Sequence, residues 1–298
     1  MKLGFIGLGA MGAPMAGHLL AAGHTLHVWS RRPASTDFAR AKGALWCESP
    51  AAVAGESDIV FTNVFSDADV HDLAFRTDGL AEGFARGGIH VDFSTISPTM
   101  ARRIAAHYAT RGIDFVDAPV TGGSVGATQA TLSIMWGGRD ELGERLLPLF
   151  ALLGKTIVRI GQPGDGQVAK ACNQMIMVAA IEACAEAAHL ADAQGIDFGT
   201  VREALMGGSA ASRVLDVFGG RLAARDFQAG VMSRLHHKDY ALLMGEATHL
   251  GVPLPVSVTV SQQLNSAMAM GAGERDTSCL LRVMESADTV FSTEKETA

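Results

Sequence analysis

The first 160 residues of the chain alternate short apolar runs with stretches of helical periodicity, and this alternation most constrains the fold. Strands that alternate with helices form βαβ units, in which the strands lie parallel and helices cover both faces of the sheet. The pattern therefore predicts a doubly wound α/β domain. We expect helices such as 11–22 and 98–111, and strands over residues 3–6, 25–29, 59–62, 89–93, 115–117, 131–136 and 156–160.

The pattern changes at residues 161–166, a turn-rich Gly-Gln-Pro-Gly-Asp-Gly break after which no strand-like alternation follows. One helical pattern of 28 residues then runs over 167–194 and is rich in Ala and Met. Because it is apolar nearly all round, it should be buried on nearly every face, against the first domain, a partner subunit or both. Further helices are expected at 197–207, 239–250 and 254–270, and a frayed end at 292–298.

The length of 298 residues is typical of two domains. We therefore expect an α/β domain over residues 1–162 and an all-helical domain over residues 163–298. The helical domain would bind substrate and join copies of the chain, so that a homodimer or homotetramer is expected.

Charge and cysteine content exclude several classes of partner. A net charge of −7 argues against binding nucleic acid or an anionic membrane through bulk charge. The four cysteines are scattered without a CxxC pair, which favours reduced thiols rather than a disulfide framework. No apolar run approaches the ~20 residues of a membrane-spanning helix. We expect a cytoplasmic protein.

A glycine motif follows the first expected strand and opens the first expected helix. Gly7, Gly9 and Gly12 form GxGxxG, in which the glycines permit a tight turn, close approach of a pyrophosphate and close helix–strand packing. The helix N-terminus adds unpaired N–H groups. This context predicts a Rossmann-type dinucleotide site, made by the backbone of Gly7, Leu8, Gly9, Ala10, Met11 and Gly12.

The end of the second expected strand indicates which dinucleotide binds. A carboxylate at this place would hydrogen-bond the ribose 2′-hydroxyl of NAD. The chain instead has Ser30, Arg31 and Arg32, a hydroxyl and two guanidinium groups that can hold a 2′-phosphate. We expect NADP(H) in preference to NAD(H), with NAD(H) as the second option.

Four segments in this order resemble the β-hydroxyacid dehydrogenase family, which includes 3-hydroxyisobutyrate dehydrogenases and 2-hydroxy-3-oxopropionate (tartronate semialdehyde) reductases. Residues 4–16 resemble the extended dinucleotide signature, and 117–123 (Asp-Ala-Pro-Val-Thr-Gly-Gly) the substrate-binding motif. Residues 164–173 resemble the catalytic-helix motif, and Lys238-Asp239 the Lys-Asp pair of the C-terminal domain. The resemblance covers nearly the whole chain.

The resemblance implies a role for each matching residue. Lys170 is the general acid that protonates the developing alkoxide, and burial would lower the pKa of its amine toward neutrality. Asn173 lies three residues later on the same helix face and binds the substrate oxygen. The substrate carboxylate is bound by Thr121, Gly122 and Gly123, and the cofactor further by Val64, Phe65, Ser94, Thr95 and Lys238.

The chain departs from the family pattern at three places. Thr121 replaces a frequent Ser and keeps the hydroxyl, whereas Gln174 replaces a frequent second Asn. The usual proline is missing from residues 63–66, which puts the shape of that cofactor loop in question. His236-His237 suggests a metal site, but neighbouring helical residues point about 100° apart and no further ligands accompany them, so no metal is expected.

Residues 207–216 most resemble the tartronate semialdehyde reductases, which favours 2-hydroxy-3-oxopropionate as substrate. 3-Hydroxyisobutyrate, glyoxylate and succinic semialdehyde remain alternatives, because one methylene changes affinity by only ~1–3 kcal/mol. Two other classes share the fold: a non-catalytic cofactor-binding scaffold, and an imine reductase. Both are disfavoured because the chain retains Lys170.

Overall fold

The computed structural model describes residues 1–228 and 230–286 of the chain. Contacts between Cα atoms divide the chain into two compact units, Met1–Lys170 and Ala171–Ala298. The division falls inside the long helix, eight residues beyond the boundary expected at 162. The segment 292–298, expected to be frayed, lies outside the described residues.

Unit 1 contains a sheet of nine strands in the order β3-β2-β1-β4-β5-β6-β8-β7, with β9 paired to β8. The first six strands in this order, from β3 through β2, β1, β4 and β5 to β6, are parallel to their neighbours. This is the strand order of a dinucleotide-binding sheet. The register turns antiparallel where β6 and β7 meet β8. The strands are β1 (Lys2–Ile6), β2 (Thr25–Trp29), β3 (Leu45–Trp46), β4 (Ile59–Thr62), β5 (Ile89–Asp92), β6 (Asp114–Asp117), β7 (Val120–Thr121), β8 (Leu132–Gly137) and β9 (Gly154–Gly161).

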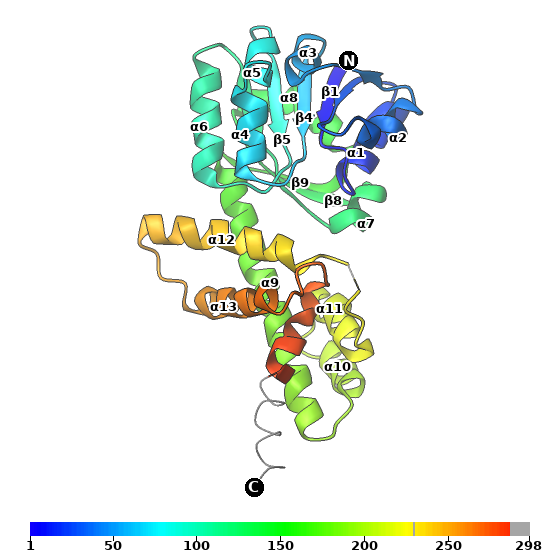
Figure 1. The fold of residues 1–298 in the computed structure, drawn as a ribbon, viewed down its shortest axis with the longest axis vertical. Helices are drawn as coiled ribbons and strands as arrows, with labels where there is room; N and C mark the ends of the chain where they lie inside the picture. Colours follow the sequence, from blue (N-terminus) through cyan, green and yellow to red (C-terminus); the bar gives the residue numbers. More distant parts are fainter. Residues whose placement is uncertain (229, 287–298) are drawn as a thin grey trace. The chain divides into compact units, whose positions relative to one another are not determined.

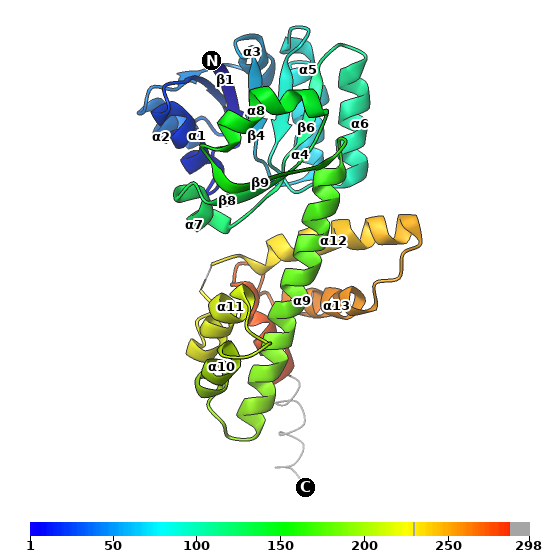
Figure 2. The ribbon, with the colours of Figure 1, turned by 180° about the vertical axis from the view of Figure 1, so that it is seen from behind.

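Helices cover both faces of this sheet, because successive strand residues are apolar on both sides. Phe5 packs into one core with α1, α7 and α8, whereas Ile6 packs into the other with α3 to α6. Figure 1 shows α4 and α5 in front of the strands, and Figure 2 shows α8 in front from behind. The helices are α1 (Gly12–Ala21), α2 (Asp37–Arg40), α3 (Pro50–Gly55), α4 (Asp67–Phe75), α5 (Leu80–Gly83), α6 (Pro98–Ala109), α7 (Gly123–Thr128) and α8 (Gly143–Phe150), with 3₁₀ turns at Pro33–Thr36 and Asp140–Leu142.

Unit 2 is helical and packs around the long helix α9 (Asp165–Ala193), which begins in unit 1. Val178, Ile181, Ala185 and Ala188 of α9 are buried at helical spacing in its core. Around them lie α10 (Phe198–Met206), α11 (Arg213–Ala224), α12 (Ser233–Leu250), α13 (Pro255–Ala269) and the 3₁₀ turn η3 (Thr277–Cys279). Helices α12 and α13 lie side by side in both views (Figures 1 and 2).

The structure confirms the α/β and helical organisation and corrects the elements in several places. The sequence pattern missed β3, β7 and α11, and α12 begins six residues before the expected position 239. Within the single chain α9 is not buried on nearly every face, and its expected burial against a partner subunit stays a prediction. Ile176 and Leu190 of α9 are 68% and 67% exposed, because no element among residues 1–228 and 230–286 covers them.

Helix α9 also corrects the expectation about apolar runs. It is the one helix among the described residues that is long and apolar enough to cross a membrane by length and composition. Core helices of soluble proteins pass the same test, so this property by itself is weak support for a membrane span.

Candidate active site

The glycine loop after β1 is shaped so that a side chain would be excluded. Gly7 has φ +98°, and a Cβ there would lie 2.1 Å from the carbonyl oxygen of Asn63. A Cβ on Gly12 would lie 2.0 Å from the carbonyl oxygen of Gly7. Gly9 differs, since a Cβ there would meet nothing within 4 Å. Gly7 and Gly12 thus fix the turn at the N-terminus of α1, and Gly9 keeps space open for a pyrophosphate, so the loop fits a dinucleotide.

The side chains after β2 form the adjoining rim. Arg31 and Arg32 are exposed and Ser30 is half-buried. Arg31 forms an ion pair with Asp69, a residue of the first turn of α4, in which Nη2 of Arg31 lies 2.9 Å from Oδ1 of Asp69. The backbone N–H and Oδ2 of Asp69 both contact the hydroxyl of Ser66, which caps α4. Asp69 therefore fixes Arg31 in place, and a 2′-phosphate would have to share this guanidinium with a carboxylate.

Ser94 joins two loops at the carboxyl edge of the sheet. Its hydroxyl accepts the backbone N–H of Val64 at 2.9 Å and donates to Oδ1 of Asp92 at 2.6 Å. Val64 is half-buried and Phe65 exposed, so this bond shapes the loop that lacks the expected proline. Thr95 follows Ser94 and is half-buried.

Asp92 ends β5 and is fully buried beneath Ser94. It also accepts the hydroxyl of Thr62 at 2.7 Å. Burial raises the pKa of Asp92 to about 6, although the hydrogen bonds from Ser94 and Thr62 act in the opposite direction. Because Asp92 orients the Ser94 hydroxyl, which binds the N–H of Val64, it fixes the loop after β4 from inside the core.

Asp117 ends β6 and holds the first turn of α9. Its Oδ1 accepts the backbone N–H of Gly164 at 2.6 Å, and its Oδ2 accepts that of Gln167 at 2.8 Å. A Cβ on Gly137 or Gly166 would come within 2.8 Å of this carboxylate, which explains why glycines surround it. Burial raises the pKa of Asp117 to about 7, and the two N–H groups oppose that shift. Capping unpaired N–H groups with a buried carboxylate locates the start of α9 firmly.

Gln167 provides the second anchor of α9. Its Nε2 donates to the carbonyl oxygen of Ser94 at 2.8 Å, and its Oε1 accepts the N–H of Ile96 at 3.2 Å. Lys170 lies three residues later and is 7% exposed, and its Nζ donates to the carbonyl oxygen of Val120 at 2.9 Å. Unit 1 therefore brings the amine of Lys170 beside the end of β7.

The residues after Val120 form the loop that is expected to bind the substrate carboxylate, which we call the anion loop. Gly122 has φ +129° and Gly123 φ +63°, conformations that L side chains rarely adopt, and Thr121 is half-buried. A Cβ on Gly123 would meet nothing within 4 Å, so its backbone is accessible to a ligand. Consecutive N–H groups and a hydroxyl can bind a carboxylate. Unit 1 thus places Lys170 and the loop of Thr121, Gly122 and Gly123 together.

The predicted residues of unit 2 form a second group. Nδ2 of Asn173 donates to Oε1 of Gln174 at 2.8 Å, and Nε2 of Gln174 donates to Oδ2 of Asp239 at 2.5 Å. Oδ1 of Asp239 pairs with Nζ of Lys238 at 2.9 Å. These four side chains of α9 and α12 form one chain of contacts, which we call the amide relay.

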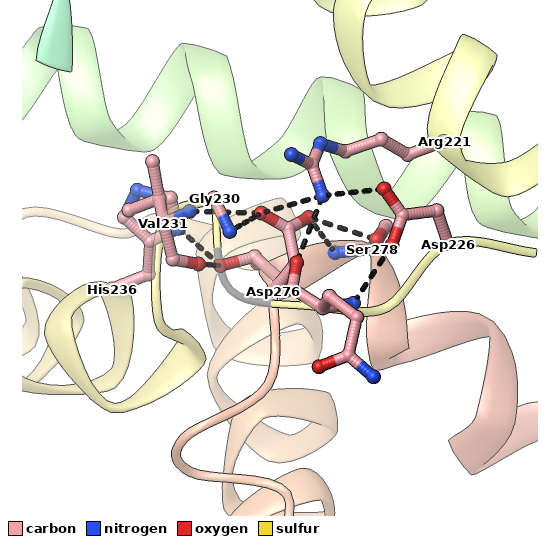
Figure 3. Close-up of polar contacts among 9 residues, drawn as sticks. Arg221, Asp226, Gly230, Val231, His236, Asp276 and Ser278 are labelled. Carbon is pink, nitrogen blue, oxygen red and sulfur yellow. Dashed lines mark hydrogen bonds and ion pairs between the residues drawn. The ribbon is translucent and has the colours of Figure 1, made fainter. Parts of the chain in front are cut away.

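An aspartate fixes the segment that leads into α12 (Figure 3). Oδ2 of Asp276 accepts the backbone N–H groups of Gly230 and Val231 at 3.2 and 2.8 Å. Its Oδ1 accepts the N–H and hydroxyl of Ser278 at 3.0 and 2.8 Å. Arg221 approaches the same carboxylate and donates to the carbonyl oxygen of Gln228 at 2.8 Å. This cluster, the Asp276 clamp, positions the N-terminal end of the helix that carries Lys238.

The two neighbouring histidines of α12 bind different partners. Nδ1 of His236 contacts the hydroxyl of Thr277 at 2.7 Å, and Nε2 of His237 contacts Oδ1 of Asn265 at 2.9 Å. Across residues 1–228 and 230–286, no group of three or more His, Cys, Asp or Glu side chains is arranged to hold a metal ion.

Several residues of the site were not assigned roles from sequence. Asp117, Gln167 and Asp239 lie inside the quoted motifs, which was the available signal, but their partners are distant in the chain. Asp69 and Gln174 carried no such signal, and Gln174 stood out only as a departure from the family pattern.

Comparisons with known proteins cover nearly the whole chain. A family model described as the NAD binding domain of 6-phosphogluconate dehydrogenase matches residues 2–161. A second, described as NAD-binding of NADP-dependent 3-hydroxyisobutyrate dehydrogenase, matches residues 164–284. The 2-hydroxy-3-oxopropionate reductase of Escherichia coli (strain K12) is 42% identical over 285 residues, which cover 96% of this chain and 97% of that protein.

Solved structures agree with these matches. Mycobacterium tuberculosis 3-hydroxyisobutyrate dehydrogenase, solved with L-serine, has a TM-score of 0.87 at 29% identity, covering 95% of this chain and 98% of that one. A structure described as Psf3 in complex with NADP+ and 2-OPP has a TM-score of 0.84 at 26% identity, covering 95% and 99%. The chain therefore belongs to the β-hydroxyacid dehydrogenase family, whose members include 3-hydroxyisobutyrate dehydrogenase, and it is an NAD(P)-dependent oxidoreductase.

Proposed function

We propose that the protein reduces 2-hydroxy-3-oxopropionate, a three-carbon hydroxy-aldehyde acid, to the corresponding 2,3-dihydroxy acid with NADPH. The observation that carries this proposal is the hydrogen bond from Nζ of Lys170 to the carbonyl oxygen of Val120. It holds a buried ammonium directly before the loop of Thr121, Gly122 and Gly123, which suits a carboxylate. A substrate with a carboxylate and an aldehyde a short distance apart satisfies both groups.

Each residue has a defined task in this reaction. NADPH supplies a hydride to the carbonyl carbon when it is bound. Lys170 donates a proton to the carbonyl oxygen, becomes a neutral amine and regains a proton from solvent; in the oxidation direction the neutral amine is the base. Asn173, one helical turn further along α9, offers an amide to the same oxygen. Thr121 and the two glycines hold the carboxylate.

The preference for NADP(H) rests on the rim after β2. Arg31 and Arg32 present two guanidinium groups where NAD-specific proteins have a carboxylate. Asp69 forms an ion pair with Arg31, so a 2′-phosphate would compete with this carboxylate for one of the two guanidinium groups. Ser94 and Val64 order the neighbouring loop, and Lys238 is assigned to the cofactor on family resemblance. We further propose that the enzyme acts in the cytoplasm.

The exposed apolar side chains of α9 support an oligomer. Ile176 and Leu190 leave large apolar areas uncovered on one chain. We propose a homodimer or homotetramer formed through unit 2, in which a second copy covers this face.

A panel of aldehyde acids tests the function. The purified protein is given 2-hydroxy-3-oxopropionate, the semialdehyde of 3-hydroxyisobutyrate, glyoxylate and succinic semialdehyde, each with NADPH and with NADH, and nicotinamide absorbance is followed. The highest kcat/KM is expected for 2-hydroxy-3-oxopropionate with NADPH. A higher kcat/KM for another acid would make that acid the preferred substrate. No turnover with any of the acids would refute the proposed function.

A further inference from the structure

Four side chains of unit 2 form the amide relay, and only its two ends have been assigned to ligands by family resemblance. Asn173 and Lys238 are these ends, and Gln174 and Asp239 lie between them. We propose that Gln174 and Asp239 are positioning residues that set the orientation of the Asn173 amide toward the substrate oxygen. This inference rests on the proposed function, because it needs a substrate that Asn173 binds.

Burial is the first reason for this assignment. Gln174 is 3% exposed, and the side chain of Asp239 is 8% exposed. Water has little access to either group, so their orientation is set by protein partners. Both ends of the Gln174 amide are used, its oxygen by Asn173 and its nitrogen by Asp239. The amide therefore has one favourable orientation, since a reversed amide would face Asn173 with a donor and Asp239 with an oxygen.

The direction of each hydrogen bond is the second reason. Asp239 accepts from Lys238 and Gln174, so its negative charge fixes Gln174 with Oε1 toward Asn173. Oε1 then accepts one N–H of Asn173, which fixes the plane of that amide. An amide whose plane is fixed loses less conformational freedom when it binds a substrate oxygen. The longer side chain of Gln, where the family often has Asn, is what reaches from α9 to α12.

The far end of the relay is held in place as well. The Asp276 clamp fixes the segment before α12, as Figure 3 shows. The first residue of α12, Ser233, donates its N–H to the carbonyl oxygen of Arg275 at 2.8 Å and its hydroxyl to that of Ala272 at 2.7 Å. The N-terminal end of α12 is thus anchored by interactions that do not involve the relay, which gives Asp239 a fixed position.

Exchanging the carboxylate and the amide tests the relay. Gln174→Met removes both hydrogen bonds with little change of volume. Gln174→Glu places two carboxylates against each other, and Asp239→Asn removes the charge that fixes Gln174. The double variant Gln174→Glu/Asp239→Asn keeps the total charge and restores every donor–acceptor pair, with the amide and the carboxylate exchanged. Tyr240→Phe is the matched control, since it removes a different α12–α9 bond, from the Tyr240 hydroxyl to the carbonyl oxygen of Met175 at 3.0 Å.

Four quantities are measured on the full-length protein: KM for the aldehyde acid, kcat, NADPH affinity by fluorescence, and Tm. Gln174→Met should raise KM about 10-fold, the size of one lost hydrogen bond, while NADPH affinity stays unchanged. Gln174→Glu should raise KM further, and the double variant should return KM to within ~3-fold of the wild type. Tyr240→Phe should lower Tm without changing KM.

Three results would overturn the inference. The first is a KM of the Gln174→Met variant that equals the KM of the Tyr240→Phe control, which would mean that the amide relay contributes only to packing. The second is a double variant no better than Gln174→Glu. The third is a wild type that reduces no aldehyde acid, which refutes the proposed function and leaves Asn173 no substrate to bind. If the wild type reduces the aldehyde acid and Gln174→Met leaves KM unchanged, the positioning role of the relay is refuted but the proposed function is not.

Discussion

Lys170 and Val120 lie fifty residues apart in the sequence, yet Nζ of Lys170 donates to the carbonyl oxygen of Val120 at 2.9 Å. This bond ties a buried ammonium to the strand that leads into the anion loop. Asp117 and Gln167 fix the helix turn from which the lysine extends. Lys170 therefore has a defined position in unit 1 before any substrate binds.

Replacing Lys170 with Ala should abolish most turnover. The expected loss in kcat is ~10²–10⁴-fold, the usual contribution of a general acid. NADPH affinity, measured by fluorescence without substrate, should remain within ~3-fold of the wild type, because no cofactor contact is assigned to this residue. Unchanged turnover would remove Lys170 from the mechanism.

Two glycines of the cofactor loop should respond differently to a side chain. The Cβ of Gly9→Val would meet nothing within 4 Å, so Tm should change little while NADPH binding is lost. Gly7→Ala would place a Cβ against Asn63 at φ +98° and should destabilise the fold by about 2 kcal/mol or more. Thermal unfolding and cofactor fluorescence separate the two effects. If Gly9→Val bound NADPH normally, the loop would not hold the pyrophosphate.

The ion pair between Arg31 and Asp69 makes a prediction about cofactor choice. Arg31→Asp should weaken NADPH binding by ~10–100-fold, as expected for a lost charge-assisted contact, and should affect NADH binding far less. Asp69→Asn removes the carboxylate that competes with a 2′-phosphate for Arg31 but keeps its size, and should strengthen NADPH binding by a small factor. Dissociation constants for both cofactors provide the comparison. Equal effects of Arg31→Asp on NADPH and NADH would refute NADP selection by this residue.

Glu182 of α9 should make stability depend on pH. It is 4% exposed with no partner for Oε2 among the described residues, and burial, with a smaller effect of Glu186, raises its pKa to about 7. The folded state therefore binds this proton more tightly than the unfolded state, and the group's contribution to stability is lost as the pH rises from about 4.5 to above 7.

Urea unfolding at several pH values measures this contribution. Between pH ~4.5 and ~8, the free energy of unfolding of the wild type should fall by up to about 3 kcal/mol more than that of Glu182→Gln. Glu186→Gln on the exposed side of the same helix is the control and should follow the wild type closely. Parallel pH curves for the wild type and Glu182→Gln would contradict the raised pKa.

The apolar face of α9 predicts self-association. Ile176→Glu or Leu190→Glu would place a charge in the proposed interface and should shift sedimentation toward the monomer. Val125→Glu is the control, because Val125 is 64% exposed in unit 1. If neither α9 variant changes the oligomeric state, the interface does not include this face of α9. A monomeric wild type would refute the proposed oligomer.

The α/β architecture was predictable because its strands carry apolar residues on both sides, as Phe5 and Ile6 do. The short strand β3 was missed because Leu45 and Trp46 are partly exposed and span only two residues. The start of α12 was missed because its first turns bury Ser233, His236 and Asp239, which are polar. Apolar periodicity cannot detect a helix that buries polar groups through hydrogen bonds.

The site was predictable where chemistry resides in a local motif. Lys170 and the loop 121–123 could be named because they lie in segments that resemble the family's motifs. The roles of Asp117 and Gln167 depend on partners 47–73 residues away, which only the folded chain specifies. The relay could not be predicted, since Gln174 acts through a residue of another helix.

The buried carboxylate of Asp117 has a consequence for biosynthesis. Its two N–H donors belong to Gly164 and Gln167, so a nascent chain that ends at 162 would leave this buried carboxyl without those hydrogen-bond partners inside the sheet. We therefore expect unit 1 to reach its final form only once the first turn of α9 has been synthesised. Lys170, the proposed general acid, therefore belongs to the same stretch of polypeptide that completes the fold.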